Sequence, residues 1–300
     1  MSTTLFIGLG HMGSPMATRH SREHRTAVFD LSADAVAQVV ASGGATAVDA
    51  LDHLPEGIDT VILMLPTSRH VEHTLLGAQG LLQALPSGSL VIDMGSSEPD
   101  STRALATEAS RHGIDYVDAP VSGGVPKADS GELAIMVGGT PAAVERALPH
   151  LKVLGSSILH VGPAGAGDAA KALNNLVSAS NIAVASEALS IADRFGIDPA
   201  TMTSVLNEAT GRSQATELKF PRYILTGSFD SGFAYDLMLK DMTIAMGIAD
   251  GLDTPVVDTV FAQLRSSRGR LGEKPDHTEI GRLYGLGATS QPPTQKETSK

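Results

Sequence analysis

The feature that most constrains the fold is a glycine-rich turn near the N-terminus, between a short apolar segment and a helical one. The sequence LFIGLGHMGSPMA sets Gly8, Gly10 and Gly13 in a G-x-G-x-x-G pattern. The first glycine permits a tight turn out of a strand, the second lets a pyrophosphate approach the backbone, and the third lets the next helix pack on the sheet. This order predicts a dinucleotide-binding turn, with contacts expected along its whole length: Gly8, Leu9, Gly10, His11, Met12 and Gly13.

An acidic residue closes the same unit. The apolar segment TAVFD ends in Asp30, which lies 22 residues after Gly8. A carboxylate at about this spacing accepts hydrogen bonds from the adenosine ribose hydroxyls. Because it would repel a 2′-phosphate, we expect NAD as the cofactor rather than NADP. Glycines at this spacing also occur in ordinary turns of other doubly wound domains, so the prediction depends on the strand, helix and acid around them.

Composition limits the partners and the location. The chain has 300 residues, of which 42% are hydrophobic and 18% charged, as in ordinary globular proteins of two domains. A net charge of -11 argues against nucleic acid as a partner, and the absence of cysteine excludes disulfides and thiolate chemistry. The first apolar segment begins too early for a signal peptide, and no apolar run reaches the roughly 18 residues of a membrane span. We therefore expect a soluble, cytoplasmic protein that binds no membrane.

Strand-like and helix-like segments alternate over the first half of the chain. After TAVFD, apolar strands are expected at residues 59–65, 89–95, 114–120, 133–139 and 158–162. Near-continuous apolar strands separated by helices predict a mainly parallel sheet covered on both faces. The expected fold class is therefore α/β, with an N-terminal Rossmann-like, doubly wound NAD-binding domain over residues 1–163.

The pattern changes after residue 164. The proline-free segment from Gly167 to Gly196 predicts a helix of about 30 residues, roughly 45 Å long, which would bridge two domains. Further helices are expected at 199–210, 236–251 and 254–269. We expect an all-α substrate and oligomerisation domain over 164–288 that begins with the bridging helix, and a flexible polar tail over 289–300.

Two segments offer groups for binding and proton transfer. The small residues of DAPVSGG can turn backbone N–H groups toward a carboxylate, although the same residues also suit an ordinary loop. Lys171 and Asn175 share one face of the bridging helix among small apolar residues. A lysine partly removed from water can exchange a proton near neutral pH, whereas one at a helix edge simply extends to solvent.

Other site chemistries have less support. Lys240, in DLMLKDMTIA, suits either an interhelix salt bridge or a contact with the cofactor or substrate. His70 and His73 lie close together on a predicted helix, but we expect no metal site. Gly95-Ser96-Ser97 lacks the G-x-S-x-G pattern of a nucleophile elbow, which disfavours hydrolysis.

Together these segments resemble the β-hydroxyacid dehydrogenase family, the family of 3-hydroxyisobutyrate dehydrogenase and tartronate semialdehyde reductase. The resemblance runs in family order through GLGHMGSPMA, VILMLPTS, VIDMGSSEP, DAPVSGGVPKADSGELAIMVGG, GAGDAAKALNN and GFAYDLMLKD, and covers nearly the whole chain. It implies a Rossmann domain followed by an all-α domain, NAD(P)-dependent oxidation of a small 3-hydroxy acid, and homodimers or homotetramers. Imine reductases share this architecture but usually lack the catalytic lysine.

The resemblance also assigns roles by position. It implies that Lys171 is the catalytic lysine, that Asn175 orients the substrate, and that the carboxylate-binding loop is Ser122, Gly123 and Gly124. It implies further cofactor contacts at Leu65, Pro66, Ser96 and Lys240, with Asp241 completing the KD pair. The family usually has Ser-Thr where this chain has Gly95-Ser96, so the hydroxyl near the nicotinamide persists and the methyl does not.

The expected function is reversible, NAD-dependent oxidation of a 3-hydroxyisobutyrate-like acid to its semialdehyde, with Lys171 as general acid and base. Tartronate semialdehyde reduction and oxidation of serine, threonate or a related sulfonate are alternatives. A phosphorylated sugar acid would need more basic residues than this acidic chain offers. A non-catalytic dinucleotide-binding protein would not need Lys171, Asn175 and the Ser122 loop together.

Overall fold

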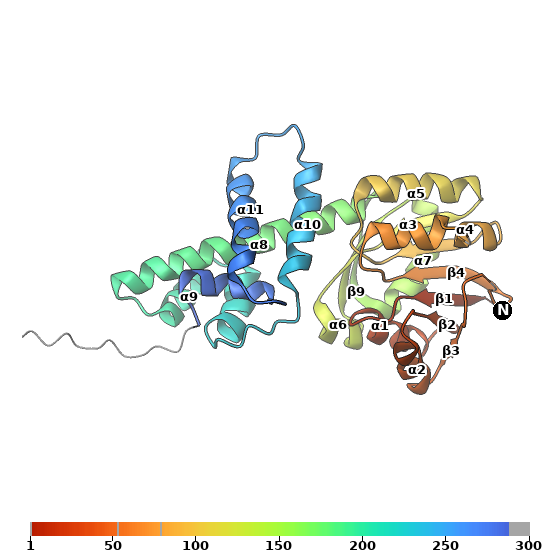
Figure 1. Cartoon of the computed structure of the whole chain (residues 1–300), viewed down its shortest axis with the longest axis horizontal. Helices are drawn as coiled ribbons and strands as arrows, with labels where there is room; N and C mark the ends of the chain where they lie inside the picture. The colour runs from red at the N-terminus through yellow and green to blue at the C-terminus, as the bar shows by residue number, and fades with distance from the viewer. Residues whose placement is uncertain (1, 53, 79, 288–300) are drawn as a thin grey trace, which may run out of the picture. The chain divides into compact units, whose positions relative to one another are not determined.

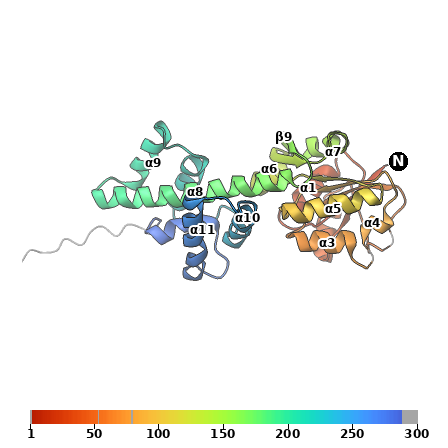
Figure 2. The same cartoon turned by 90° about the horizontal axis from the view of Figure 1, so that it is seen from above.

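The computed structural model describes residues 2–52, 54–78 and 80–287, so the expected tail at 289–300 lies outside the described residues. The chain divides into two compact units, Met1–Asn174 and Asn175–Lys300. The division falls inside helix α8, Ala166–Phe195, whereas the sequence places a boundary at the start of that helix. The predicted long, uninterrupted helix is therefore present, and it contributes residues to both units (Figures 1 and 2).

Nine strands form one sheet among the described residues of the first unit, in the order β3-β2-β1-β4-β5-β6-β8-β7 with β9 paired to β8. Their bounds are β1 Thr3–Ile7, β2 Thr26–Phe29, β3 Ala45–Ala47, β4 Ile58–Leu63, β5 Leu90–Asp93, β6 Asp115–Asp118, β7 Val121–Ser122, β8 Leu133–Gly138 and β9 Gly155–Gly162. The strands from β3 to β6 pair in parallel, and β8 runs antiparallel to β6 and β7. The predicted doubly wound, mainly parallel sheet is confirmed.

Helices cover both faces of this sheet (Figure 2). One core contains residues of α1 (Gly13–His20), α2 (Ala33–Ala41), α6 (Gly124–Ser130) and α7 (Pro141–Leu154). The other contains residues of α3 (Ser68–Leu76), α4 (Leu81–Ala84) and α5 (Pro99–Arg111). Along β1, Phe6 belongs to the first core whereas Leu5 and Ile7 belong to the second, as expected for strand side chains that alternate between faces.

Local sequence explains where helix α7 begins. The Thr140 hydroxyl accepts a hydrogen bond from the Ala143 N–H at 3.2 Å, and Pro141 occupies the first turn of α7. Such a cap satisfies one of the amide groups that the helix itself leaves without a partner, and proline suits the first turn because its missing N–H is not needed there.

The second unit is helical, as the sequence predicts. Beyond α8 it contains α9 (Pro199–Glu208), the π-helix η1 (Ala215–Ile224), α10 (Tyr235–Ile248), α11 (Pro255–Ser267) and the short 3₁₀ helices η2 (Arg268–Arg270) and η3 (His277–Tyr284). No sequence pattern predicts η1, whose buried side chains include Phe220 and Ile224. Within the described parts of the chain, no helix combines the length and the apolar character that crossing a membrane requires.

Candidate active site

The glycine turn has the geometry expected of a phosphate-binding turn. Gly8 has φ of +95°, and a Cβ added there would overlap the Met64 carbonyl oxygen. A Cβ at Gly13 would overlap the Gly8 carbonyl oxygen, so the start of α1 packs too tightly for any side chain. At exposed Gly10 no other atom lies within 4 Å of such a Cβ. The turn therefore leaves open space beside its backbone, just before the N-terminus of α1, which fits a pyrophosphate.

Asp30 is held directly beside this turn. Its Oδ2 accepts a hydrogen bond from the Leu9 N–H at 2.6 Å, and its Oδ1 accepts one from the Ser32 N–H at 2.8 Å. Each carboxylate oxygen has a second lone pair, so the group can still accept hydrogen bonds from ribose hydroxyls. The next residue, Leu31, is 95% exposed. The arrangement fits an adenosine ribose and offers no cation at residue 31 for a 2′-phosphate.

The loops after β4 and β5 adjoin the glycine turn. Strands β1 and β4 are neighbours from which the chain departs to opposite sides of the sheet, and dinucleotides bind at such a switch point. Leu65 and Pro66 follow β4, while Ser96 follows β5. A Cβ at Gly95 would lie 2.8 Å from the Leu65 carbonyl oxygen, so these two loops touch. The cofactor contacts predicted in the first unit therefore lie at one edge of the sheet.

Two buried carboxylates, which the sequence analysis did not identify, attach α8 to this edge. Asp118, at the end of β6, accepts hydrogen bonds from the N–H groups of Gly165 and Asp168 at 2.8 and 3.1 Å. Asp118 therefore caps the start of α8, although it lies on strand β6. A negative charge at a helix N-terminus also complements the helix dipole. Asp168 in turn accepts hydrogen bonds from the Ser97 N–H at 3.0 Å and the Thr102 hydroxyl at 2.7 Å. The helix is thereby joined to the loop that carries Ser96.

A third carboxylate completes this network. Asp93 accepts hydrogen bonds from the Gly95 N–H at 3.0 Å, the Ser97 hydroxyl at 3.0 Å and the Tyr116 hydroxyl at 3.2 Å. Burial raises the pKa of Asp93 to about 6, and it also raises the pKa of Asp118 and of Asp168. Repulsion among the three carboxylates acts in the same direction. Protons are therefore held in this network at pH values where exposed carboxyls are ionised.

The raised pKa of Asp93 predicts a pH-dependent effect of the Asp93→Asn substitution on stability. Protonation of Asp93 stabilises the folded state below the ordinary pKa of 3.8, and that contribution is lost as the pH rises through about 6. An asparagine carries no charge at either pH and can still accept from Gly95 and donate to both hydroxyls. From pH 4 to pH 7, the unfolding free energy of Asp93→Asn should therefore rise by about 2 kcal/mol relative to the unmodified protein.

Urea unfolding at both pH values measures this difference, in which contributions from groups common to both proteins cancel. Asp49→Asn, at an exposed position, is the matched control and should show little change. A difference for Asp93→Asn that stays constant, or falls, between pH 4 and pH 7 would contradict the assignment of a raised pKa.

Lys171 and Asn175 lie one turn apart on α8, and each is only 8% exposed. Lys171 follows Asp168 by three residues, so the carboxylate network fixes the turn that precedes it. The Asn175 Nδ2 donates a hydrogen bond to Asp241 Oδ2 at 2.6 Å, and the Lys240 Nζ lies 3.2 Å from Asp241 Oδ1. Asp241 therefore orients Asn175 and pairs with Lys240, a combined role that the sequence analysis did not predict.

The predicted carboxylate-binding loop follows β7, the last strand in the sheet order given above. Ser122 ends β7 and pairs with Ala134 of β8, and Gly124 begins α6. Gly123 and Gly124 have φ of +145° and +71°, which L side chains rarely adopt, and both are exposed.

The structure thus gathers the glycine turn, the loops after β4 and β5 and the start of α8 in the first unit. Separately, it joins Asn175, Lys240 and Asp241 in the second.

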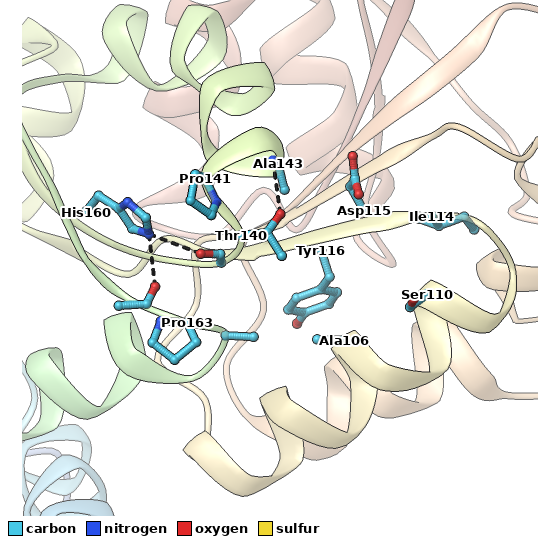
Figure 3. A pocket seen from close by; sticks show the side chains of 13 residues that line it. Ala106, Ser110, Ile114, Asp115, Tyr116, Thr140, Pro141, Ala143, His160 and Pro163 are labelled. Atoms are coloured by element: carbon cyan, nitrogen blue, oxygen red, sulfur yellow. Dashed lines mark hydrogen bonds between the residues drawn. The ribbon is translucent and has the colours of Figure 1, made fainter.

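A cavity of about 460 Å³ lies elsewhere in the first unit and contains none of the predicted site residues (Figure 3). Its lining comes from α5, β6, the start of α7 and the end of β9. His160 lies at one end of it, with contacts to the Gly139 and Gly162 carbonyls at 3.0 Å each. Tyr116 lines this cavity and donates its hydroxyl hydrogen bond to Asp93. The cavity therefore adjoins the carboxylate network.

Comparison with known proteins agrees with this architecture. The family model for the NAD binding domain of 6-phosphogluconate dehydrogenase matches residues 3–162, and the model described as NAD-binding of NADP-dependent 3-hydroxyisobutyrate dehydrogenase matches residues 165–284. The chain is 41% identical over 266 residues to 2-(hydroxymethyl)glutarate dehydrogenase of Eubacterium barkeri, covering 88% of both chains. It is 37% identical to 3-hydroxyisobutyrate dehydrogenase of Pseudomonas aeruginosa, covering 95% of this chain and 99% of the other.

A solved structure gives the same correspondence. The 3-hydroxyisobutyrate dehydrogenase of Mycobacterium tuberculosis with L-serine aligns with a TM-score of 0.86 at 30% sequence identity. The alignment covers 94% of this chain and 99% of that one, so it includes both units.

Proposed function

Because the chain belongs to the β-hydroxyacid dehydrogenase family of 3-hydroxyisobutyrate dehydrogenase and its relatives, we propose that it oxidises a small 3-hydroxyisobutyrate-like acid to its semialdehyde, reversibly and with NAD. Family membership makes it an NAD(P)-dependent 3-hydroxyacid dehydrogenase that acts on a CH–OH group. The observation that supports Lys171 as the acid and base beside the cofactor is the hydrogen bond from the Ser97 N–H to Asp168, which fastens the helix turn before Lys171 to the loop of Ser96.

The cofactor would be held by the residues at the edge of the sheet. The pyrophosphate would lie along the turn from Gly8 to Gly13, and Asp30 would accept hydrogen bonds from the adenosine ribose. Leu65, Pro66, Ser96 and Lys240 would provide further contacts. When bound, the nicotinamide supplies the redox chemistry by accepting a hydride from the substrate carbon.

The protein's own groups would bind the acid and move the proton. The substrate carboxylate would accept hydrogen bonds from the backbone of Ser122 to Gly124, and Asn175, oriented by Asp241, would fix the hydroxyl. In oxidation, a neutral Lys171 amine would remove the hydroxyl proton at Nζ. In reduction, the Lys171 ammonium would polarise the carbonyl and return the proton.

A substrate screen tests this proposal. Reduction of NAD should be followed with 3-hydroxyisobutyrate, glycerate, L-serine, threonate, dihydroxypropanesulfonate and 2-(hydroxymethyl)glutarate. We expect the highest kcat/KM with 3-hydroxyisobutyrate. The 41% identity to a 2-(hydroxymethyl)glutarate dehydrogenase favours that dicarboxylate as the second candidate. If none of the acids reduces NAD or NADP above background, the proposed substrate class is wrong.

The exposed apolar side chains of α8 support an oligomer as part of the proposal. They are Leu173, Val177, Val184, Ile191 and Phe195. At 100° per residue these five fall within about 40° of one another, while Lys171 and Asn175 point to the opposite side of the helix. A long apolar stripe on a soluble protein commonly marks an interaction surface.

We therefore expect a homodimer or homotetramer in which α8 packs against another copy and buries on the order of 2,000 Å². Light scattering at micromolar concentration should give twice or four times the 31.0 kDa chain mass. Val184→Asp and Ile191→Asp together should shift the protein toward monomer, whereas Val125→Asp, at an exposed position on α6, should not. A monomer in the unmodified protein would refute the proposal.

A further inference from the structure

Three histidines form a cluster in the first unit, apart from the residues assigned above to cofactor and substrate. His20 is the last residue of α1, His24 lies in the turn that follows, and His150 lies on α7. One ring nitrogen from each lies within 4.8 Å of the other two. The closest pair, His20 Nε2 and His150 Nδ1, is 3.0 Å apart, and the His24 ring centroid lies 4.6 and 4.7 Å from those of the other rings.

Hydrogen bonds define which nitrogens carry lone pairs. The Thr26 hydroxyl donates to the His24 carbonyl at 2.8 Å, so its oxygen accepts from the His20 Nδ1–H, also at 2.8 Å. This leaves His20 Nε2 as the lone-pair nitrogen that faces His150. His24 Nε2 lies 3.3 Å from the Pro149 carbonyl, which can only accept, so His24 Nδ1 carries the lone pair. Histidine ligands of metals are commonly oriented by such a second hydrogen bond.

The surroundings of the cluster keep the ligand nitrogens unprotonated. Burial, together with repulsion from the other histidines, lowers the pKa of His20 to about 3 and that of His150 to about 4. Both rings are therefore neutral at neutral pH, as a metal ligand requires. The Asp59 carboxylate acts on His150 in the opposite direction and adds negative charge near the cluster. The guanidinium of Arg19, the residue before His20, is hydrogen-bonded to backbone oxygens. Its Nε donates to the Val153 carbonyl at 2.6 Å.

We propose that His20, His24 and His150 bind one divalent transition-metal ion, of which Zn²⁺ fits best. Imidazole nitrogens suit zinc, copper and nickel. Zn–N bonds of about 2.0 to 2.1 Å in a tetrahedron place the nitrogens roughly 3.3 Å apart, close to the separation of His20 and His150. The His20 ring is stacked on those of His24 and His150 at interplanar angles of 20° and 17°, so metal binding requires the two half-buried rings, His24 and His150, to turn toward one ion. A water would complete the tetrahedron.

Metal binding at this cluster would have a structural effect. The His150 Nδ1–H now directed at His20 would be exchanged for the Nε2–H tautomer, so no net proton is lost from that ring. Helix α1 has eight residues and is about 12 Å long, which separates His20 from the glycine turn at its other end. The ion would clamp α1 to α7 and take no part in the redox chemistry.

Zinc titration of the full-length protein, after dialysis against a chelator, tests this site by calorimetry and by thermal unfolding. We expect one Zn²⁺ per chain, with a micromolar or lower Kd, and a higher Tm when Zn²⁺ is present. His150→Gln and His24→Gln, both at partly exposed positions, should each weaken binding at least tenfold and remove the increase in Tm. Co²⁺ titration should give the visible absorption of a tetrahedral or five-coordinate site in the unmodified protein only.

His73→Gln, on α3, is the matched control because it removes a histidine from another helix, and it should leave Zn²⁺ binding unchanged. Circular dichroism of each variant without metal establishes that its fold is intact. The proposal is wrong if the unmodified protein binds Zn²⁺ only at millimolar concentration. It is also wrong if His24→Gln and His150→Gln fold and bind Zn²⁺ as the unmodified protein does.

Discussion

Replacing Lys171 with alanine should lower kcat for the best substrate by about 10²- to 10⁴-fold, the range that loss of a positioned acid or base produces. The residue is 8% exposed, so no bulk water would readily replace its amine. The Kd for NAD should change little because the phosphates are held by the turn from Gly8 to Gly13. Stopped-flow measurement of NADH formation, with NAD binding measured by calorimetry, separates the two effects.

Lys171→Arg distinguishes proton transfer from electrostatic orientation. A guanidinium keeps the positive charge but does not release its proton near neutral pH, so this variant should be nearly as slow as Lys171→Ala. Lys152→Ala, which removes an exposed lysine from α7, is the control and should keep full activity. If Lys171→Arg retained most of the original kcat, Lys171 would act by charge alone.

The fold was largely predictable because its main elements have local sequence signals. Near-continuous apolar segments marked the central strands, and the proline-free segment from Gly167 to Gly196 marked α8 to within a residue at each end. Strand β3, three residues long, and β7, two residues long, have no such signal. Both depend on pairing with a neighbouring strand, which is a property of the assembled sheet. The π-helical η1 likewise has no periodic pattern that the sequence analysis recognised.

The candidate site was predictable where function requires a local motif, and less so where it depends on contacts distant in sequence. The glycine turn and Asp30 form one unit, and the structure places Asp30 against Leu9 within it. The hydrogen bonds that Asp118 and Asp168 accept join residues 47 to 71 positions apart, and no spacing rule reports such contacts. His20 and His24 are four residues apart, which was a readable signal, but His150 lies 130 positions from His20 and only the fold brings it there.

Replacing Asp30 with alanine should narrow the preference for NAD over NADP by about ten- to a hundredfold in kcat/KM. Two unit charges about 4 Å apart interact by about 4 kcal/mol at an effective dielectric constant of 20, and solvent at this half-buried site reduces that value. A tenfold change corresponds to about 1.4 kcal/mol, so the expected range lies within this limit. The reduced preference for NAD should appear mainly as a lower KM for NADP. The KM for NAD should increase somewhat because the ribose hydroxyls lose their acceptor.

The position of Leu31 allows the same argument to be tested by adding charge. Its side chain is 95% exposed, so arginine fits there without disturbing the core, and a guanidinium can bind a 2′-phosphate through two hydrogen bonds. Asp30→Ala with Leu31→Arg should therefore reverse the preference, whereas Asp34→Ala, at an exposed position on α2, should leave it unchanged. Equal kcat/KM values for NAD and NADP in the unmodified enzyme would mean that Asp30 does not select the cofactor. Its role would then be limited to the two backbone hydrogen bonds by which it holds the glycine turn against the end of β2.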